Sequence, residues 1–265
     1  MKIIEPTRSG NPDLYNIHEH QALRSGARQS AERIIPILRK WITPNSVLDF
    51  GCGNGAWLSA FREAGVSEIF GLDGGYVEET DFLIPPECFR SHDLTHPIDL
   101  DRRFDLVMSL EVAEHLPPES AADFVHCLTR HGEIILFSAA IPDQGGLNHL
   151  NERWQSYWVK LFQEQGYQVL DPLRPVIWND RKIRIWYRQN TLLFASPGAL
   201  LRNSFLQTAA ERTDRGRIDC VHPEMWQEKI TNPCAWANAD GFSAGKVVRA
   251  LPRIVKKEVQ RRLDR

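Results

Sequence analysis

The chain has 265 residues, of which 42% are hydrophobic and 25% charged, enough for one large domain or one domain with an extension. A net charge of −2 excludes a chain that is basic overall and binds nucleic acid by charge alone, and no window approaches the apolar length of a membrane span. Five scattered cysteines without a C-x-x-C pair, and a start without a signal-peptide core, predict a reducing, cytoplasmic location with neither a zinc site nor disulfides.

The first predicted element is an amphipathic helix. Residues 1–29 are polar and irregular, and we treat them as an N-terminal cap segment. Ser30 is placed to cap a helix that ends before Pro44. The apolar residues expected on one face of this helix are Ile34, Ile35, Ile37, Leu38 and Trp41.

A strand, a tight turn and a second helix follow. Residues 47–50 form an apolar run that includes Asp49, and they predict a buried strand. Three glycines at alternate positions, Gly51, Gly53 and Gly55, allow a sharp turn and let a ligand approach the backbone. A helix is expected to begin at Ala56, so the turn is placed as a nucleotide-type binding loop at the carboxyl edge of a parallel sheet.

Two acids decide what this loop binds. Asp49 stands two residues before the first glycine, where it would repel a pyrophosphate but suits a ligand with an amino group and a sulfonium. Asp73 closes the next apolar run, where a carboxylate can bind two ribose hydroxyls. The stretch resembles motif I and the following acidic position of the class I S-adenosylmethionine-dependent methyltransferases. The alternative is a strand, turn and helix that bind no ligand.

This resemblance implies a set of residues that bind S-adenosylmethionine. A third strand is expected around Cys88, and in the family an acid at its exit meets the adenine amine while the next residue packs on the ring. Asp93 and Leu94 match that pattern, although Asp93 can equally be a turn-forming residue. In this fold the polar segment before the first helix often lies over the cofactor; a frayed terminus is the alternative. The implied cofactor-binding residues are Asp49, Gly51, Cys52, Gly53, Gly55, Asp73, Gly74, Asp93, Leu94 and Leu110.

The fourth predicted strand, residues 104–110, runs into the sequence Glu111-Val112-Ala113-Glu114-His115. An E-x-x-E-H run after this strand is widespread among O-methyltransferases of the resembled family. On a helical turn Glu111, Glu114 and His115 would lie on one face, and with His149 they could bind Mg²⁺ or Mn²⁺. Alternatively, His115 or His149, with Glu114, provides a metal-free base, or the Glu-His pair is only a structural turn. His149 could also be a plain surface residue.

The later elements continue the alternation of helix and strand. We expect a helix at 119–130, a strand at 133–140, a Gly/Pro/Asn loop at 141–149, a helix at 151–165 and a sixth strand from Gln168. Residues 183–195 are expected to form the last strand region, with the polar break Arg188-Gln189-Asn190 facing the acceptor pocket. The order of these motifs resembles small methyltransferases of glycan or polysaccharide synthesis.

The predicted fold is α/β, a doubly wound, seven-stranded Rossmann-like sheet over residues 30–196. The resemblance implies that the seventh strand is antiparallel. Residues 197–265 form a C-terminal extension that ends in a basic amphipathic helix at 252–265. That helix either packs on the acidic body, which we favour, or touches an anionic membrane surface.

The sequence therefore predicts an S-adenosylmethionine-dependent O-methyltransferase that acts on a hydroxyl of a glycan, a sugar or another small molecule. Enzymes of the resembled family that methylate an adenine or glutamine nitrogen carry an Asn/Asp-Pro-Pro-aromatic segment after the fourth strand, whereas this chain has Ser109-Leu110-Glu111-Val112. A nucleic-acid partner is not expected. The alternatives are a nicotinamide-dependent oxidoreductase, which the glycine spacing opposes, and a non-catalytic cofactor-binding scaffold.

Overall fold

The computed structural model describes residues 26–74 and 82–231. The predicted basic helix at 252–265, and all but the last four residues of the predicted cap segment, lie outside these ranges. Within the described ranges, no helix combines the length and the apolar character needed to cross a membrane. The four cysteines of these ranges are free, as expected from their scatter.

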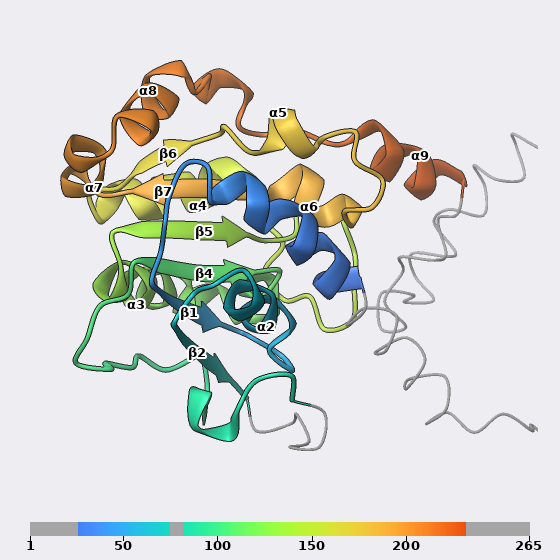
Figure 1. Ribbon diagram of the computed structural model, residues 1–265. Coiled ribbons are helices and arrows are strands. Elements are labelled where there is room, and N and C mark those ends of the chain that lie inside the picture. The colour runs from blue at the N-terminus through green and yellow to red at the C-terminus, as the bar shows by residue number, and fades with distance from the viewer. Residues whose placement is uncertain (1–25, 75–81, 232–265) are drawn as a thin grey trace, which may run out of the picture.

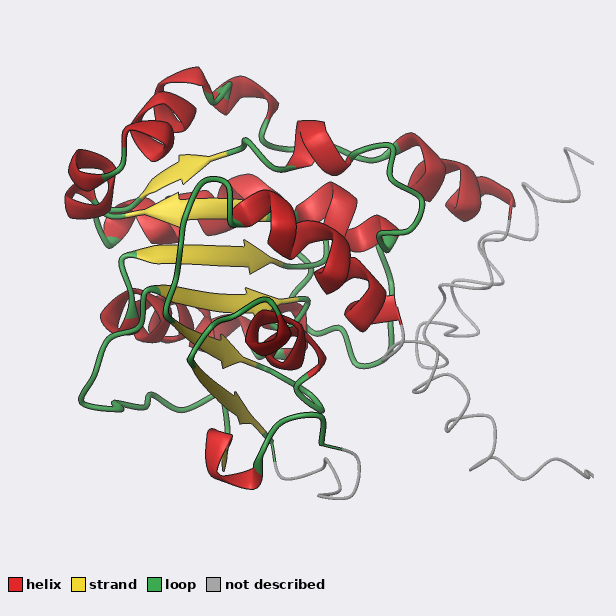
Figure 2. Ribbon diagram, viewed as in Figure 1, coloured by secondary structure: helices red, strands yellow, loops and turns green. Residues whose placement is uncertain are grey.

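Seven strands form one sheet in the order β3-β2-β1-β4-β5-β7-β6 (Figures 1 and 2). The neighbours β1 to β5 pair in parallel, and β7 runs antiparallel to both β5 and β6, which confirms the predicted doubly wound sheet with its antiparallel seventh strand. The strands are β1 Ser46–Phe50, β2 Glu68–Asp73, β3 Phe89–Ser91, β4 Leu106–Leu110, β5 Ile134–Ser138, β6 Gln168–Leu170 and β7 Leu192–Ala195.

Helices cover both faces of the sheet (Figure 1). Successive residues of β1 enter opposite cores: Val47 packs with the helix at 26–38 and with α2, and Leu48 packs with α3 and α4. Burial on both faces explains why the parallel strands read as unbroken apolar runs. The labelled helices are α2 Ala56–Glu63, α3 Ala121–His131, α4 Gln155–Glu164, α5 Arg174–Ile177, α6 Ile185–Asn190, α7 Pro197–Arg202, α8 Ser204–Arg212 and α9 Pro223–Thr231, with 3₁₀ turns at Pro86–Cys88, Ala113–His115, Pro118–Ser120 and Arg215–Arg217.

Two local predictions are wrong. Ser30 does not cap the first helix but lies inside it, fully buried, and its hydroxyl donates to the carbonyl of Gly26 at 2.6 Å. The predicted strand at residues 183–187 instead contains the two residues before helix α6 and the first three residues of that helix, and of the last strand region only β7 is a strand. Ile183 and Tyr187 are both buried and stand four residues apart, so the short apolar run fits a helix as well as a strand.

The described part of the C-terminal extension packs on the body of the sheet. Trp41 stacks on Phe205 of α8, with ring centroids 4.8 Å apart, and Asn203 donates from its amide to the carbonyl of Trp41 at 2.8 Å. Leu200 and Leu206 belong to the same buried cluster as α2. Residues 197–212 therefore share the core of the predicted domain.

Candidate active site

The glycine turn follows β1. All three glycines have left-handed backbones, with φ of 86° at Gly51, 53° at Gly53 and 81° at Gly55. A Cβ at Gly51 would lie 2.3 Å from Val112, and one at Gly55 would lie 2.8 Å from Ile84, whereas one at Gly53 would meet no atom of the described residues within 4 Å. Gly51 and Gly55 are thus needed for packing, and the backbone of Gly53 faces the space where a ligand can approach.

Asp73 ties this turn to the end of β2. Its carboxylate accepts the backbone N–H of Gly53 at 2.6 Å and that of Gly74 at 2.7 Å. Asp49 is buried nearby, and burial, assisted by the charge of Asp73, raises the pKa of Asp49 well above its usual range. Burial and the same two carboxylates also raise the pKa of the Cys52 thiol, so this cysteine is a packing residue rather than a nucleophile.

Asp93 lies on the surface beyond β3. Its carboxylate accepts the backbone N–H of Thr95 at 3.0 Å and the Thr95 hydroxyl at 2.7 Å, and these bonds are the main reason why its pKa is lowered. Such bonding is that of a turn-forming aspartate. The neighbouring backbone N–H of His92 donates to the carbonyl of Asp73 at 2.8 Å, so the exit of β3 still contacts the end of β2. The adenine role of Asp93 stays a prediction.

Three of the four predicted metal or base residues meet at the carboxyl ends of β4 and β5. Ligand atoms of Glu114, His115 and His149 all lie within 4.8 Å of one another. The two imidazole rings have centroids 4.8 Å apart and cross at 85°. Glu114 is buried, and its Oε2 atom has no hydrogen-bond partner among the described residues. Burial and the charge of Glu111 raise the pKa of Glu114 well above its usual range.

Glu111 does not join this cluster. The predicted helical turn is wrong here: Glu111 has a left-handed backbone, φ 57°, and only residues 113–115 form a 3₁₀ turn. The Glu111 carboxylate turns instead toward Asn190 and Gln144, whose amides donate to it at 3.1 Å each. Burial raises the pKa of this carboxyl although these bonds oppose the rise.

Glu152 is a site residue that the sequence interpretation missed. Its Oε1 accepts from Nδ1 of His149 at 2.8 Å and from the backbone N–H of Gly145 at 2.6 Å. Burial alone would raise the pKa of Glu152, but the bond from His149 and the other hydrogen bonds outweigh it and lower that pKa. The bond fixes the His149 ring and leaves its Nε2 atom for another partner. The spacing of three residues between His149 and Glu152 was the available signal.

The polar break at residues 188–190 is buried rather than open. Asn190 holds Glu111, and Gln189 accepts the backbone N–H of His222 at 2.7 Å, which links this edge to the start of α9. Arg188 pairs with Glu224 at 2.7 Å. These three residues therefore belong to a buried network of hydrogen bonds and ion pairs.

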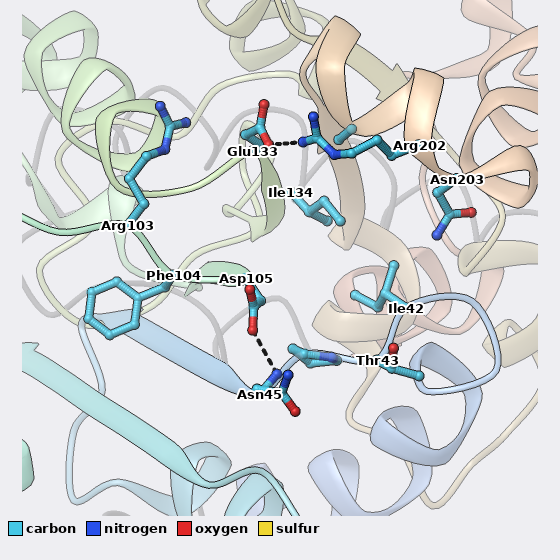
Figure 3. Close-up of a pocket in the computed structure, with 12 residues that line it drawn as sticks. Ile42, Thr43, Asn45, Arg103, Phe104, Asp105, Glu133, Ile134, Arg202 and Asn203 are labelled. Atoms are coloured by element: carbon cyan, nitrogen blue, oxygen red, sulfur yellow. Dashed lines mark hydrogen bonds and ion pairs between the residues drawn. The ribbon is translucent and has the colours of Figure 1, made fainter.

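A cavity of about 420 Å³ lies at the opposite edge of the sheet. It is lined by Asn45, Asp105 and Glu133, which precede β1, β4 and β5, and by Arg202, which pairs with Glu133 (Figure 3). The glycine turn and the His115–His149 pair follow strand ends, so this cavity is separate from them. Ligands of open α/β sheets bind at the carboxyl ends of the strands.

Comparison with known proteins shows which proteins this chain is similar to. A curated relative from Pseudomonas fluorescens, described as a tRNA U34 carboxymethyltransferase, is 28% identical over 143 residues, 50% of this chain and 43% of the relative. One from Pseudomonas putida with the same description is 30% identical over 150 residues, 52% of this chain and 45% of the relative. The chain thus spans less than half of these relatives. The solved structure of Streptomyces venezuelae DesVI aligns with this chain with a TM-score of 0.50 and 15% sequence identity. The alignment covers 71% of this chain and 100% of the DesVI chain, and it supports the fold alone.

The model of a methyltransferase domain family matches residues 20–174, more than half of the chain. The match includes the glycine turn, Asp73, Glu114 and His149. The chain therefore belongs to the methyltransferase domain family and is a class I methyltransferase whose cofactor is S-adenosylmethionine.

Proposed function

We propose that this enzyme transfers the methyl group of S-adenosylmethionine to a hydroxyl oxygen of a small acceptor, a sugar or the sugar of a glycan. The observation that carries the proposal is the cluster of Glu114, His115 and His149 at the carboxyl ends of β4 and β5. A hydroxyl acceptor must lose its proton on transfer, and this cluster provides groups that can take it.

On the cofactor side we assign the glycine turn and its two acids. The ribose hydroxyls would lie against Asp73, whose carboxylate already orients the backbone of Gly53. Asp49 suits the amino group of the methionine portion. The exposed Asp93 is the weakest of these assignments, because Thr95 holds its carboxylate. Cys52, Gly74, Leu94 and Leu110 complete the proposed cofactor surface.

On the acceptor side His149 is the favoured base. Its Nδ1 atom bonds to Glu152, so Nε2 is the atom available to receive the acceptor proton, and the carboxylate of Glu152 stabilises the imidazolium that forms. Burial, together with the neighbouring His149, lowers the pKa of His115. His115 is therefore neutral at pH 7 and can accept a hydrogen bond. Methyl transfer is an in-line displacement, so the remaining task of the protein is to position the acceptor.

The same three residues fit a divalent cation. Glu114 offers a buried carboxylate oxygen that has no partner in the part of the chain that the structure describes, and His149 is oriented by Glu152 as metal-bound histidines commonly are. Glu114, His115 and His149 would hold Mg²⁺ or Mn²⁺, which would lower the free energy of an acceptor oxyanion. Glu111 faces Asn190 and is not part of this set.

A nucleic-acid acceptor is the second candidate. Seven curated relatives match, and each is described as a tRNA U34 carboxymethyltransferase. The whole chain carries a net charge of −2, which does not favour binding to a polyanion. Because the chain belongs to a methyltransferase family, we reject the alternative that it is a nicotinamide-dependent oxidoreductase.

Methyl-labelled S-adenosylmethionine separates the two acceptor classes. The purified enzyme is incubated with a panel of sugars, nucleotide sugars and glycans in one arm and with total tRNA in the other. We expect label in the sugar panel and none in tRNA. Label in tRNA alone would overturn the sugar assignment and support the second candidate.

Three variants test the roles of the histidines. His149→Ala and His115→Ala should lose turnover by at least about 100-fold, the usual contribution of a positioned acid or base, and should still bind S-adenosylmethionine in calorimetry. His126→Ala is the matched control, since His126 is an exposed imidazole on α3 that bonds Gln165. If both site variants remain active, neither histidine is the base. Loss of activity with a chelator and recovery with Mg²⁺ or Mn²⁺ would establish the cation.

A further inference from the structure

Tyr187 links the cofactor side to the acceptor side. It lies on α6, and its ring crosses that of Trp57 at 82° with centroids 5.4 Å apart. Trp57 is the second residue of α2 and follows the glycine turn directly. Both helices cover the same face of the sheet and share one buried cluster (Figure 1). The phenol is 6% exposed, so its hydroxyl is placed inside the molecule next to the turn.

The Tyr187 hydroxyl has a proton to give. Nε1 of Trp57 donates to the hydroxyl oxygen at 3.5 Å, a long hydrogen bond in which the tyrosine is the acceptor. Among the described residues, no acceptor for the hydroxyl's own proton is found. Burial raises the pKa of Tyr187, and the charges of Glu111 and Asp49 raise it further, so the phenol stays neutral and is a donor at any working pH.

The acids around this edge leave one part of the cofactor without a partner. Asp49, Asp73 and Glu114 offer carboxyl oxygens, which suit an ammonium, a sulfonium or hydroxyls. S-adenosylmethionine also carries an α-carboxylate, which needs donors. The two buried arginines of the described residues are committed elsewhere, Arg174 to Asp171 and Arg188 to Glu224. Tyr187 is a buried donor near Asp49, and its proton has no acceptor within residues 26–74 and 82–231.

We propose that the hydroxyl of Tyr187 donates a hydrogen bond to the α-carboxylate of S-adenosylmethionine and thereby positions the methionine end of the cofactor. The inference deepens the proposed function, since it rests on the assignment of the glycine turn as the cofactor site, but it does not depend on which acceptor is methylated. Tyr187 is in this view a specificity residue for the amino-acid end of the ligand.

Two ligands that differ only in the carboxylate test the contact. Calorimetry compares S-adenosylmethionine with its decarboxylated form on the wild type and on Tyr187→Phe, which keeps the ring and its packing on Trp57. We expect the variant to bind S-adenosylmethionine about tenfold more weakly and to bind the decarboxylated ligand within about twofold of the wild type, because a charge-assisted bond is lost in one case only. Tyr167→Phe is the matched control, since its hydroxyl donates to the carbonyls of Thr129 and Gly132.

Each other result overturns the assignment. Equal weakening for both ligands, with an unchanged thermal midpoint, would mean that the hydroxyl shapes the turn and does not touch the carboxylate. No weakening for either ligand would mean that it faces away from the cofactor. Because the readout is cofactor binding, a failure to find a sugar acceptor leaves the result interpretable, and a wild type that binds neither ligand would instead refute the cofactor site.

Discussion

Asp73 holds the glycine turn and the residue after β2 with one carboxylate. Its bonds to the N–H groups of Gly53 and Gly74 fix the turn before any ligand arrives. We predict that Asp73→Ala weakens binding of S-adenosylmethionine by about 1.5–3 kcal/mol, roughly 10- to 100-fold, because a charge-assisted ribose contact is lost. Calorimetry measures this. Asp123→Ala, at an exposed position on α3, should bind as the wild type does, and an unchanged affinity in Asp73→Ala would refute the role.

Some individual residues could not be placed from the sequence. Glu111 has a left-handed backbone because its N–H is drawn to the carbonyl and hydroxyl of Ser138 on β5, and this is a contact between distant segments. A pattern of neighbouring residues predicts a continuous turn, and it contains no information on this distant contact. The sequence predicts a strand at Tyr187 for the same reason. Only the buried cluster that Tyr187 shares with Trp57 decides between helix and strand.

At the scale of elements, the chain could be read well where strands are buried on both faces. The runs ending near Asp49, Asp73 and Leu110 became β1, β2 and β4 with the expected parallel pairing. Such runs can be recognised without knowing which strands pair, because burial on both faces makes nearly every residue apolar. The short α6 gives no such signal, since six residues hold less than two helical turns.

In the glycine turn, the effect of backbone strain on stability can be measured separately from the effect on cofactor binding. Gly53 and Gly166 both have positive φ, and at both an added Cβ would meet nothing within 4 Å among the residues that the structure describes. Gly53→Ala and Gly166→Ala should therefore lose similar stability, about 1–2 kcal/mol for the left-handed backbone. Only Gly53→Ala should also lose affinity for S-adenosylmethionine, because its methyl group enters the proposed ligand space. Urea unfolding and calorimetry give the two readouts.

Replacement of Gly51, in the same turn, should affect stability more than replacement of Gly53. A Cβ there would lie 2.3 Å from Val112, so Gly51→Ala should be less stable than Gly53→Ala, since overpacking adds to the strain. Equal affinity losses in Gly53→Ala and Gly166→Ala would show that the open space over Gly53 is not where the cofactor binds.

For the whole molecule, stability depends on a buried histidine far from the active site. His131 ends α3 and is fully buried; Nδ1 lies 2.6 Å from the carbonyl of Cys127, and Nε2 accepts the backbone N–H of Leu100 at 3.0 Å. This pairing requires the neutral ring with its proton on Nδ1. Burial lowers the pKa of His131, although the bond to Cys127 and the charge of Asp99 oppose the shift. Arg130 and Arg103 lower the pKa further.

The sign of the pH dependence follows from that lowered pKa. Above the unfolded value of about 6.5 the ring is neutral in both states, and its contribution to the free energy of unfolding is fully present. As the pH falls below about 6.5, the unfolded chain takes up the proton first, and stability is lost by at most about 1.4 kcal/mol per pH unit until the folded pKa is reached. A neutral replacement that can accept from Leu100 and donate to Cys127 should remove this part of the loss.

His131→Gln is that replacement, and urea unfolding at pH 7.5 and 5.5 measures the effect. We expect the wild type to lose more free energy of unfolding between these two pH values than the variant does, although the variant can be less stable at pH 7.5 because its side chain fits less well. His126→Gln, at an exposed position on the same helix, should lose as much as the wild type. Parallel losses in the wild type and His131→Gln would mean that folding does not shift the pKa of His131, and that the acid sensitivity of the fold has its origin in other groups.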